Sequence, residues 1–185
     1  MKLLDKFIRD WRIKVALNNQ PHSMENVFDI GCDEGYLLTK ISTKIERYDG
    51  VDPRLNADII SECFELKTGF FPSVVGEHQM QGRYDAIFAL AVFEHFSEND
   101  IRQSATVISR MLAPKGRLII TVPHPFVDKI LDVLMFFRLV EGQALEEHHG
   151  FDPEELLIYF SETLKLVKRE RFQFGLNNIF IFKRF

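Results

Sequence analysis

The chain has 185 residues, of which 46% are hydrophobic and 27% charged, and its formal net charge is −4. This length suits one globular domain over residues 1–185 with a substantial core. The mild acidity gives no sign of the basic face that binds nucleic acid, so nucleic-acid partners are not expected. The two cysteines are too few for a disulfide framework and lack zinc-ligand spacing, so no metal site is predicted.

Neither a leader peptide nor a membrane span is expected. Residues 1–20 carry charges throughout, whereas a signal peptide has an uninterrupted apolar stretch. The longest apolar region, around 126–140, is interrupted by Asp128, Lys129, Asp132 and Arg138. Such a segment is too polar to cross a bilayer, which leaves the cytoplasm as the expected location.

The N-terminal half alternates helix-like and strand-like patterns. Apolar residues recur at helical spacing over residues 2–17, which predicts an amphipathic helix within an N-terminal segment 1–20. The elements predicted next are, in chain order, a strand over 27–30, a helix over 36–45, a strand over 48–51, a short helix and then a strand within 57–71, and a buried strand over 84–90.

The C-terminal half continues this alternation and closes on two strands. Ser97 and Asp100 stand at capping-box spacing, with Asp in place of the usual Glu, and predict a helix that runs to about residue 112. The elements predicted after it are a buried strand over 117–122, a helix from Asp152-Pro153 to about Thr163, and alternating strands over 165–172 and 178–182. The last two strands flank a short connection that contains Gly, which predicts a terminal hairpin.

Strands that alternate with helices indicate an α/β doubly wound fold with a mainly parallel sheet. Ligands of such folds bind beyond the carboxyl ends of the strands, where Gly31, Asp33 and Gly35 follow the first strand. Glycines there let the backbone approach a ligand, and a following helix offers free N–H groups. Asp52 ends the second strand, where a carboxylate can bind the two hydroxyls of a ribose. An adenosine-containing cofactor is therefore expected.

Two kinds of adenosine cofactor compete for this motif. The dinucleotide fingerprint needs glycines at positions 31, 33 and 36, but the chain has Asp33 and Tyr36 at two of them. The Asp33 carboxylate would also repel a pyrophosphate. A nicotinamide-dependent oxidoreductase is disfavoured by this spacing and by the predicted hairpin.

Four segments in order point to a known family. The run DIGCDEG at 29–35 resembles motif I of the class I S-adenosylmethionine-dependent methyltransferases. GVDP at 50–53, YDAIFALAVFEHF at 84–96 and LAPKGRLIITVP at 112–123 match further segments, most closely in the small-molecule group that includes ubiquinone-pathway methyltransferases. The resemblance implies a Rossmann-like, mainly parallel, seven-stranded sheet with a C-terminal antiparallel hairpin. It also implies methyl transfer from S-adenosylmethionine.

The resemblance implies a set of cofactor-binding residues at the strand ends. These are Asp29, Gly31, Cys32, Asp33, Gly35, Asp52, Pro53, Phe71, Ala89 and Leu90. Asp33 departs from the family, which has a glycine there; its carboxylate would either meet the methionine ammonium or repel the methionine carboxylate. Cys32 is most simply a small buried filler and not a nucleophile. The adenine-binding residues are not identified, although Phe70 or Phe71 is a candidate apolar wall.

Two histidines are the candidate catalytic residues. His95 and His124 follow the fourth and fifth strands of the family pattern, and histidine is tuned for proton transfer near neutral pH. A structural or solvated role is the alternative for each. The candidate substrate-binding residues are Glu94, Phe126, His148 and His149. Glu94 and His95 resemble the Glu-His pair of the family.

The segment 124–150 is where this family diversifies for its substrate. It is rich in Val, Ile, Leu, Met and Phe, so an acceptor that it roofs is expected to be apolar or lipid-linked. The resemblance implies that this acceptor is a small molecule, methylated at oxygen or nitrogen. Packing of this segment on the sheet is the plainer alternative. A catalytically silent, methyltransferase-like scaffold is the second functional hypothesis, motivated by Asp33 and by the lack of an identifiable acid at the adenine end of the site. The oligomeric state stays open.

Overall fold

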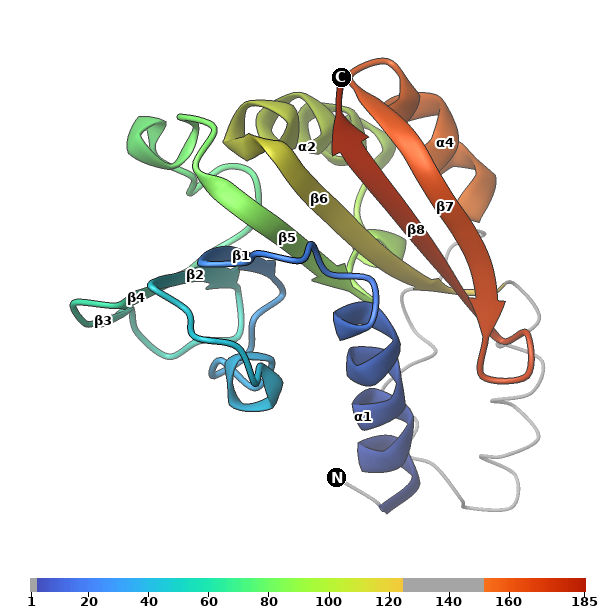
Figure 1. Ribbon diagram of the computed structural model, residues 1–185, viewed down its shortest axis with the longest axis horizontal. Coiled ribbons are helices and arrows are strands. Elements are labelled where there is room, and N and C mark those ends of the chain that lie inside the picture. Colours follow the sequence, from blue (N-terminus) through green and yellow to red (C-terminus); the bar gives the residue numbers. More distant parts are fainter. Residues whose placement is uncertain (1–2, 125–151) are drawn as a thin grey trace.

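A computed structural model describes residues 3–124 and 152–185 of the chain. Its strands form one eight-stranded sheet in the order β3-β4-β2-β1-β5-β6-β8-β7 (Figure 1). The strands are β1 (Asn26–Ile30), β2 (Arg47–Asp52), β3 (Ile59–Ile60), β4 (Phe64–Thr68), β5 (Tyr84–Leu90), β6 (Leu112–Pro123), β7 (Leu164–Phe172) and β8 (Asn177–Arg184). The pairs among β4, β2, β1, β5 and β6 are parallel, so their carboxyl ends meet at one edge.

The predicted Rossmann-like, doubly wound class is confirmed, with one strand more than the seven expected. The extra strand is β3, which contributes two residues antiparallel to β4 at the sheet's edge. At the other edge, β8 pairs antiparallel with both β6 and β7, as the predicted hairpin requires.

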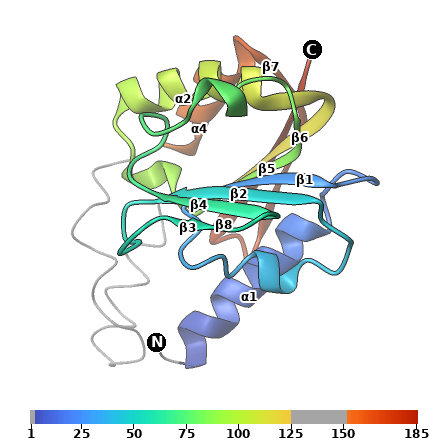
Figure 2. The ribbon, with the colours of Figure 1, turned by 90° about the vertical axis from the view of Figure 1, so that its left-hand side faces the viewer.

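Helices cover both faces of the sheet. Figure 2 shows α1 (Leu3–Leu17) on one face and α2 (Glu98–Met111) with α4 (Pro153–Ser161) on the other. Buried side chains of β5 alternate accordingly, with Phe88 in the cluster that includes Ile13 of α1 and Ile87 in the cluster that includes Ile108 of α2. Burial on both faces explains why β5 and β6 read as almost continuous apolar runs.

Two helices begin where their capping residues predict. Ser97 accepts the backbone N–H of Asp100 through its hydroxyl at 3.2 Å, and it begins α2. Asp152 accepts the N–H of Glu154 at 2.9 Å and begins α4, with Pro153 in the first turn. In both cases a side-chain oxygen satisfies a backbone donor that the helix itself leaves unpaired.

Two local predictions were wrong. The helix expected over 36–45 is only a short 3-10 helix, Leu38–Lys40, and Ile41 after it is extended. The run Thr-Lys-Ile-Ser-Thr at 39–43 is poor in strong helix formers, which explains the early end. The short helix expected after residue 57 is instead β3, whose two β-branched isoleucines favour an extended strand.

Among the described residues, no helix combines the length and the apolar character needed to cross a membrane.

Candidate functional site

The loop after β1 is bound to the end of β2 by backbone hydrogen bonds. The N–H groups of Gly31 and Cys32 both donate to the carbonyl of Val51, at 2.8 and 3.2 Å. Gly35 N–H then donates to the Cys32 carbonyl at 2.9 Å. The predicted motif is therefore an ordered turn at the carboxyl edge of the sheet, where this fold binds its ligands.

Gly31 is required both by its backbone angle and by a close contact. Its φ is +78°, and a Cβ there would lie 2.5 Å from Cγ2 of Val92. This contact packs the loop after β1 against the segment after β5. Gly35 also has a positive φ, +79°, while Asp33 between them has φ +50° and is exposed. Asp is among the residues that tolerate this left-handed region.

Asp52 lies at the end of β2 and is bound to the loop. Its Oδ2 accepts the backbone N–H of Asp33 at 2.8 Å, and its Oδ1 accepts the N–H of Arg54 at 2.8 Å. The Arg54 guanidinium Nε also lies 3.4 Å from Oδ1, and Asp52 is only 1% exposed. The Arg54 side chain is 77% exposed, so it can move aside at little cost. Each carboxylate oxygen then keeps a lone pair for a ribose hydroxyl.

Asp29, the first residue of the motif, is buried beneath the loop. The Tyr48 hydroxyl donates to its Oδ2 at 2.6 Å. Burial raises the pKa of Asp29 to about 7, although the Tyr48 hydrogen bond acts in the opposite direction. This hydrogen bond links β1 to β2 at the start of the motif.

Cys32 fills a small space beside β2. It is 2% exposed, and a Cβ on Gly50 would lie 2.7 Å from the Cβ of Cys32. Burial raises the pKa of the Cys32 thiol above its ordinary value. A buried, protonated thiol agrees with a packing role and not with a nucleophile.

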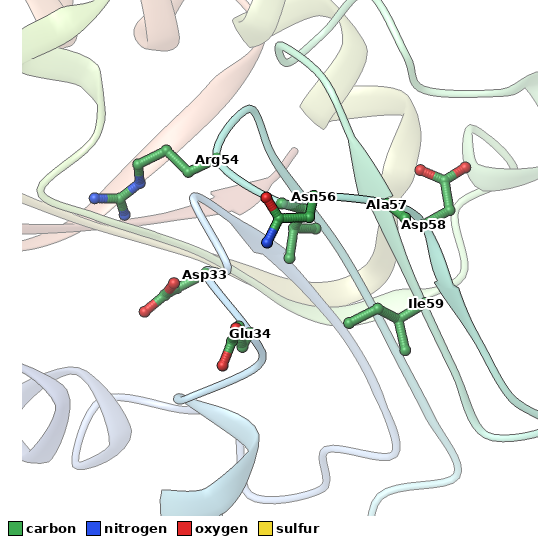
Figure 3. Close-up of a pocket in the computed structure, with 8 residues that line it drawn as sticks. Asp33, Glu34, Arg54, Asn56, Ala57, Asp58 and Ile59 are labelled. Atoms are coloured by element: carbon green, nitrogen blue, oxygen red, sulfur yellow. The ribbon is translucent and has the colours of Figure 1, made fainter.

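A pocket of about 250 Å³ opens beside the loop. Figure 3 shows Asp33 and Glu34 on the loop, and Arg54 and Asn56 on the segment after β2, among the residues that line it. The other lining residues are Leu55, Ala57, Asp58 and Ile59. The pocket lies beyond Asp52 at the same edge of the sheet. Arg54 and Asn56 were not predicted as site residues, because they belong to no sequence motif that indicates ligand binding.

The remaining predicted cofactor residues differ in their surroundings. Pro53 is exposed next to Asp52, Ala89 is fully buried in β5, and Leu90 is partly exposed at the end of that strand. Phe71 is 4% exposed and its ring packs against Phe28, with centroids 6.1 Å apart. Core packing accounts for Phe71, and its role as a pocket wall stays a prediction.

The two candidate catalytic histidines follow neighbouring strands. His95 is exposed in the 3-10 helix η3 (Phe93–His95), which follows β5. His124 follows β6, and its backbone N–H donates to the Leu176 carbonyl at 2.8 Å. Since β5 and β6 are adjacent and parallel, the structure brings both residues to the edge that carries the Gly31 loop. Phe126, His148 and His149 lie outside the described residues, as does most of the predicted insert 124–150.

Glu94 is the most unusual charged side chain at this edge. It is 6% exposed, and its Oε2 is buried without a hydrogen-bond partner. Burial raises its pKa to about 7, and the nearby Arg12 guanidinium of α1 partly opposes this shift. Arg12 was not predicted, because the spacing along α1 only marks it as the polar side of an amphipathic helix.

No three or more His, Cys, Asp or Glu side chains within the described ranges are grouped so as to hold a metal ion. The described part of the chain thus offers a nucleotide-type loop, an acid at the ribose position and two histidines. This set suits an organic cofactor that carries an adenosine.

The comparisons with known proteins agree with this geometry. Residues 2–167 match the family described as "Methyltransferase domain", which covers most of the chain. The chain therefore belongs to the methyltransferase-domain family, and its loop and sheet are those of a class I S-adenosylmethionine-dependent methyltransferase. Its methyl donor is S-adenosylmethionine, the cofactor of this class. No curated protein sequence shows significant similarity to the chain.

Solved structures share the fold at low sequence identity. The PH0226 protein from Pyrococcus horikoshii OT3 superposes with a TM-score of 0.68 at 14% identity, over 97% of this chain and 91% of that one. A TehB-like SAM-dependent methyltransferase from Corynebacterium glutamicum gives 0.65 at 14%, over 98% and 97%. The 1,6-didemethyltoxoflavin-N1-methyltransferase of Burkholderia thailandensis gives 0.65 at 15%, over 97% and 81%. At such identities the likeness shows a shared fold.

Proposed function

We propose that this methyltransferase methylates an oxygen or nitrogen atom of a small, partly apolar molecule, with the cytoplasm as its predicted location. The observation that carries the proposal is the contact between Gly31 and Val92, because it joins the donor loop to the segment that carries His95. His124 follows the adjacent strand β6. An acceptor bound over these two strand ends would lie beside the donor.

The residues at the loop have distinct roles in this proposal. The Gly31–Gly35 backbone would lie under the methionine part of the donor, and Asp52 would bind its ribose hydroxyls once Arg54 moves aside. Asp29 and Cys32 would hold the loop from below. The pocket between Asp33 and Asn56 would take the part of the donor beyond the ribose. S-adenosylmethionine supplies an electrophilic methyl group on a sulfonium, whose thioether is a good leaving group.

The acceptor side would provide alignment and a proton acceptor. A lone pair on the acceptor oxygen or nitrogen forms the new bond to the methyl carbon, and the acceptor's proton passes to an imidazole nitrogen of His95 or His124. In-line alignment of the reacting atoms supplies most of the rate enhancement in such a displacement. A positioned base adds a factor of roughly 10²–10⁴.

Two observations support a small and partly apolar acceptor. The insert 124–150 is dense in aliphatic and aromatic residues, and the net charge of −4 offers no general attraction to nucleic acid. The structural relative from Burkholderia thailandensis was solved with the small molecule 1,6-didemethyltoxoflavin bound.

A methyl-transfer screen tests the proposal. Donor labelled in its methyl group is incubated with the protein and separate panels of phenols, amines and quinone precursors, beside tRNA and protein fractions. Label in an organic-soluble small molecule is the expected result. Label confined to tRNA or protein would contradict the acceptor class.

A catalytically silent binding protein is the second candidate, favoured by one observation. Asp52 is 1% exposed and both of its oxygens accept hydrogen bonds from the chain itself. If that arrangement is permanent, the ribose site stays closed. Failure to bind the donor, together with no turnover on any acceptor, would support a silent protein, and turnover would exclude it.

A further inference from the structure

Two side chains of opposite charge, Arg12 of α1 and Glu94 of η3, each leave one buried polar atom without a hydrogen-bond partner. The Nε of Arg12 and the Oε2 of Glu94 are both buried, and neither has a hydrogen-bond partner. The two side chains attract each other electrostatically but form no direct ion pair among the described residues. Leaving a buried charge without a direct partner costs several kcal/mol in general. Such groups cluster at functional sites, where a bound ligand can satisfy them.

Contacts of the neighbouring residues place Arg12 near the donor loop. The Arg9 guanidinium lies 3.5 Å from the ring centroid of Tyr36, the residue that follows Gly35. The Tyr36 hydroxyl also donates to Asp10 at 2.7 Å. This turn of α1 thus packs against Tyr36, at the C-terminal end of the Gly31–Gly35 loop. Arg12 is three residues beyond Arg9 and so lies on the same side of the helix.

Contacts of the segment after β5 place Glu94 near the loop's entrance. Val92 is the residue that a Cβ on Gly31 would meet at 2.5 Å. Glu94 follows two residues later in η3, 94% buried. Arg12 and Glu94 therefore approach the Gly31–Gly35 loop from two different elements, one from α1 and one from η3.

We propose that Arg12 and Glu94 bind the amino-acid end of the methyl donor, Arg12 its carboxylate and Glu94 its ammonium. This end of S-adenosylmethionine is a zwitterion, and it carries one charge for each of the two unpaired groups. A guanidinium binds a carboxylate through two parallel N–H donors, and a carboxylate accepts from an ammonium. The inference rests on S-adenosylmethionine being the donor and assigns the part of the site that recognises its charged end.

This assignment changes two expectations from the sequence. Glu94 was a candidate for binding the acceptor, and the Asp33 carboxylate was a candidate for meeting the donor's ammonium. Asp33 is exposed, and it lines the pocket together with Glu34 (Figure 3). Glu94 is the more buried of the two acids and its Oε2 has no hydrogen-bond partner, so it gains more from a bound ammonium than Asp33 does.

Calorimetry with two ligands tests the pair directly. S-adenosylhomocysteine carries the amino-acid end, whereas 5′-methylthioadenosine has the same adenosine and sulfur without it. Each is titrated into the wild type, Arg12→Ala, Arg12→Lys and Glu94→Gln. Lys14→Ala is the matched control, because Lys14 is an exposed cation on the same helix.

Arg12→Ala is expected to weaken binding of S-adenosylhomocysteine roughly 10–100-fold, the scale of a hydrogen bond between charged groups. Glu94→Gln is expected to weaken it about tenfold by the same reasoning, and Arg12→Lys less than Arg12→Ala. Binding of 5′-methylthioadenosine should stay unchanged in all variants, which also shows that they are folded. Lys14→Ala should match the wild type with both ligands.

Three outcomes would overturn the inference. Affinity for both ligands falls in parallel, or neither variant differs from the wild type, or the wild type binds the two ligands equally well. In each of these cases the donor still binds and the proposed function stands. If the wild type binds neither ligand, the donor assignment itself has failed, and this inference fails with it.

Discussion

The backbone N–H of Asp33 donates to Oδ2 of Asp52 at 2.8 Å, so the residue that departs from motif I is bound to the acid at the ribose position. The side chain at position 33 therefore does not reach into this contact; only its backbone does. Asp33 adopts a positive φ of +50° in this turn. A glycine and an aspartate can both adopt this angle, which explains how the loop keeps its form with Asp33.

Replacement of Asp52 tests the ribose assignment. Asp52→Ala is expected to weaken binding of S-adenosylhomocysteine by about 1–3 kcal/mol, the scale of a lost hydrogen bond to a charged group. Glu62→Ala, an exposed acid between β3 and β4, is the control and should leave affinity unchanged. Calorimetry measures both. An unaltered affinity in Asp52→Ala would place the ribose elsewhere.

A pair of glycine substitutions isolates the contact between the donor loop and Val92. Gly31→Ala adds a Cβ 2.5 Å from Val92 Cγ2, whereas Gly175→Ala, at the similar φ of +85°, meets nothing within 4 Å. Both substitutions should lower the free energy of unfolding by roughly 1–2 kcal/mol, because alanine is disfavoured in the left-handed backbone conformation. Gly31→Ala should therefore lower the free energy of unfolding further, by an additional 1–3 kcal/mol or so for overpacking.

Chemical denaturation of the two glycine variants measures this difference. The double variant Gly31→Ala with Val92→Ala removes the methyl group that clashes, and it should recover part of the loss. Equal destabilisation by Gly31→Ala and Gly175→Ala would show that the two segments do not pack as described.

Single replacement of His95 and His124 tests the proton-transfer step. If one of them is the base, its Ala variant should turn over a methylated screen hit roughly 10²–10⁴-fold more slowly, with donor affinity retained. His78→Ala is the control, because His78 lies in a 3-10 helix away from the ends of β5 and β6. Losses below threefold in both variants would leave alignment alone to carry the reaction.

The buried Glu94 predicts a pH-dependent stability. Its pKa is about 7 in the folded protein against an ordinary 4.5, chiefly through burial, so the folded state holds this proton more tightly than the unfolded chain. Stability from this group is full below about pH 4.5 and is lost as the pH rises to about 7. Glu94→Gln should therefore gain roughly 1–3 kcal/mol on the wild type between pH 4 and pH 8.

Thermal or denaturant unfolding at the two pH values measures this gain. Glu62→Gln, which replaces an exposed acid, should change the free energy of unfolding by the same amount at pH 4 and at pH 8. A Glu94→Gln variant whose stability relative to the wild type is the same at pH 4 and pH 8 would mean that Glu94 titrates as an exposed carboxylate.

Sequence patterns within a few neighbouring residues predicted most of the helices and strands of this fold. The caps at Ser97 and Asp152 and the apolar runs of β5 and β6 are each encoded within a few neighbouring residues. The motif 29–35 was readable for the same reason, since its glycines and acids are consecutive. The missing helix after Tyr36 was not predicted, because it follows from weak helix formers over 39–43 together with contacts of Tyr36 with Arg9 and Asp10 of α1 that the spacing of apolar residues does not reveal.

The charged part of the candidate site could not be read from spacing. Arg12 and Glu94 belong to different elements, and only the packing of α1 and η3 about the loop brings them together. Periodicity marks Arg12 as one more cation on an amphipathic helix. The contacts of Arg54 with Asp52 likewise could not be predicted, because they depend on the turn after β2 and not on a sequence motif.

Calorimetric titration of the wild type with S-adenosylmethionine and S-adenosylhomocysteine, beside NAD, tests the central claim most directly. The donor loop and the acid at the end of β2 predict one binding site per chain for each of the first two ligands, with a dissociation constant well below millimolar, and no heat from NAD. Absence of binding by both sulfur ligands at millimolar concentration, together with binding of NAD, would contradict the account.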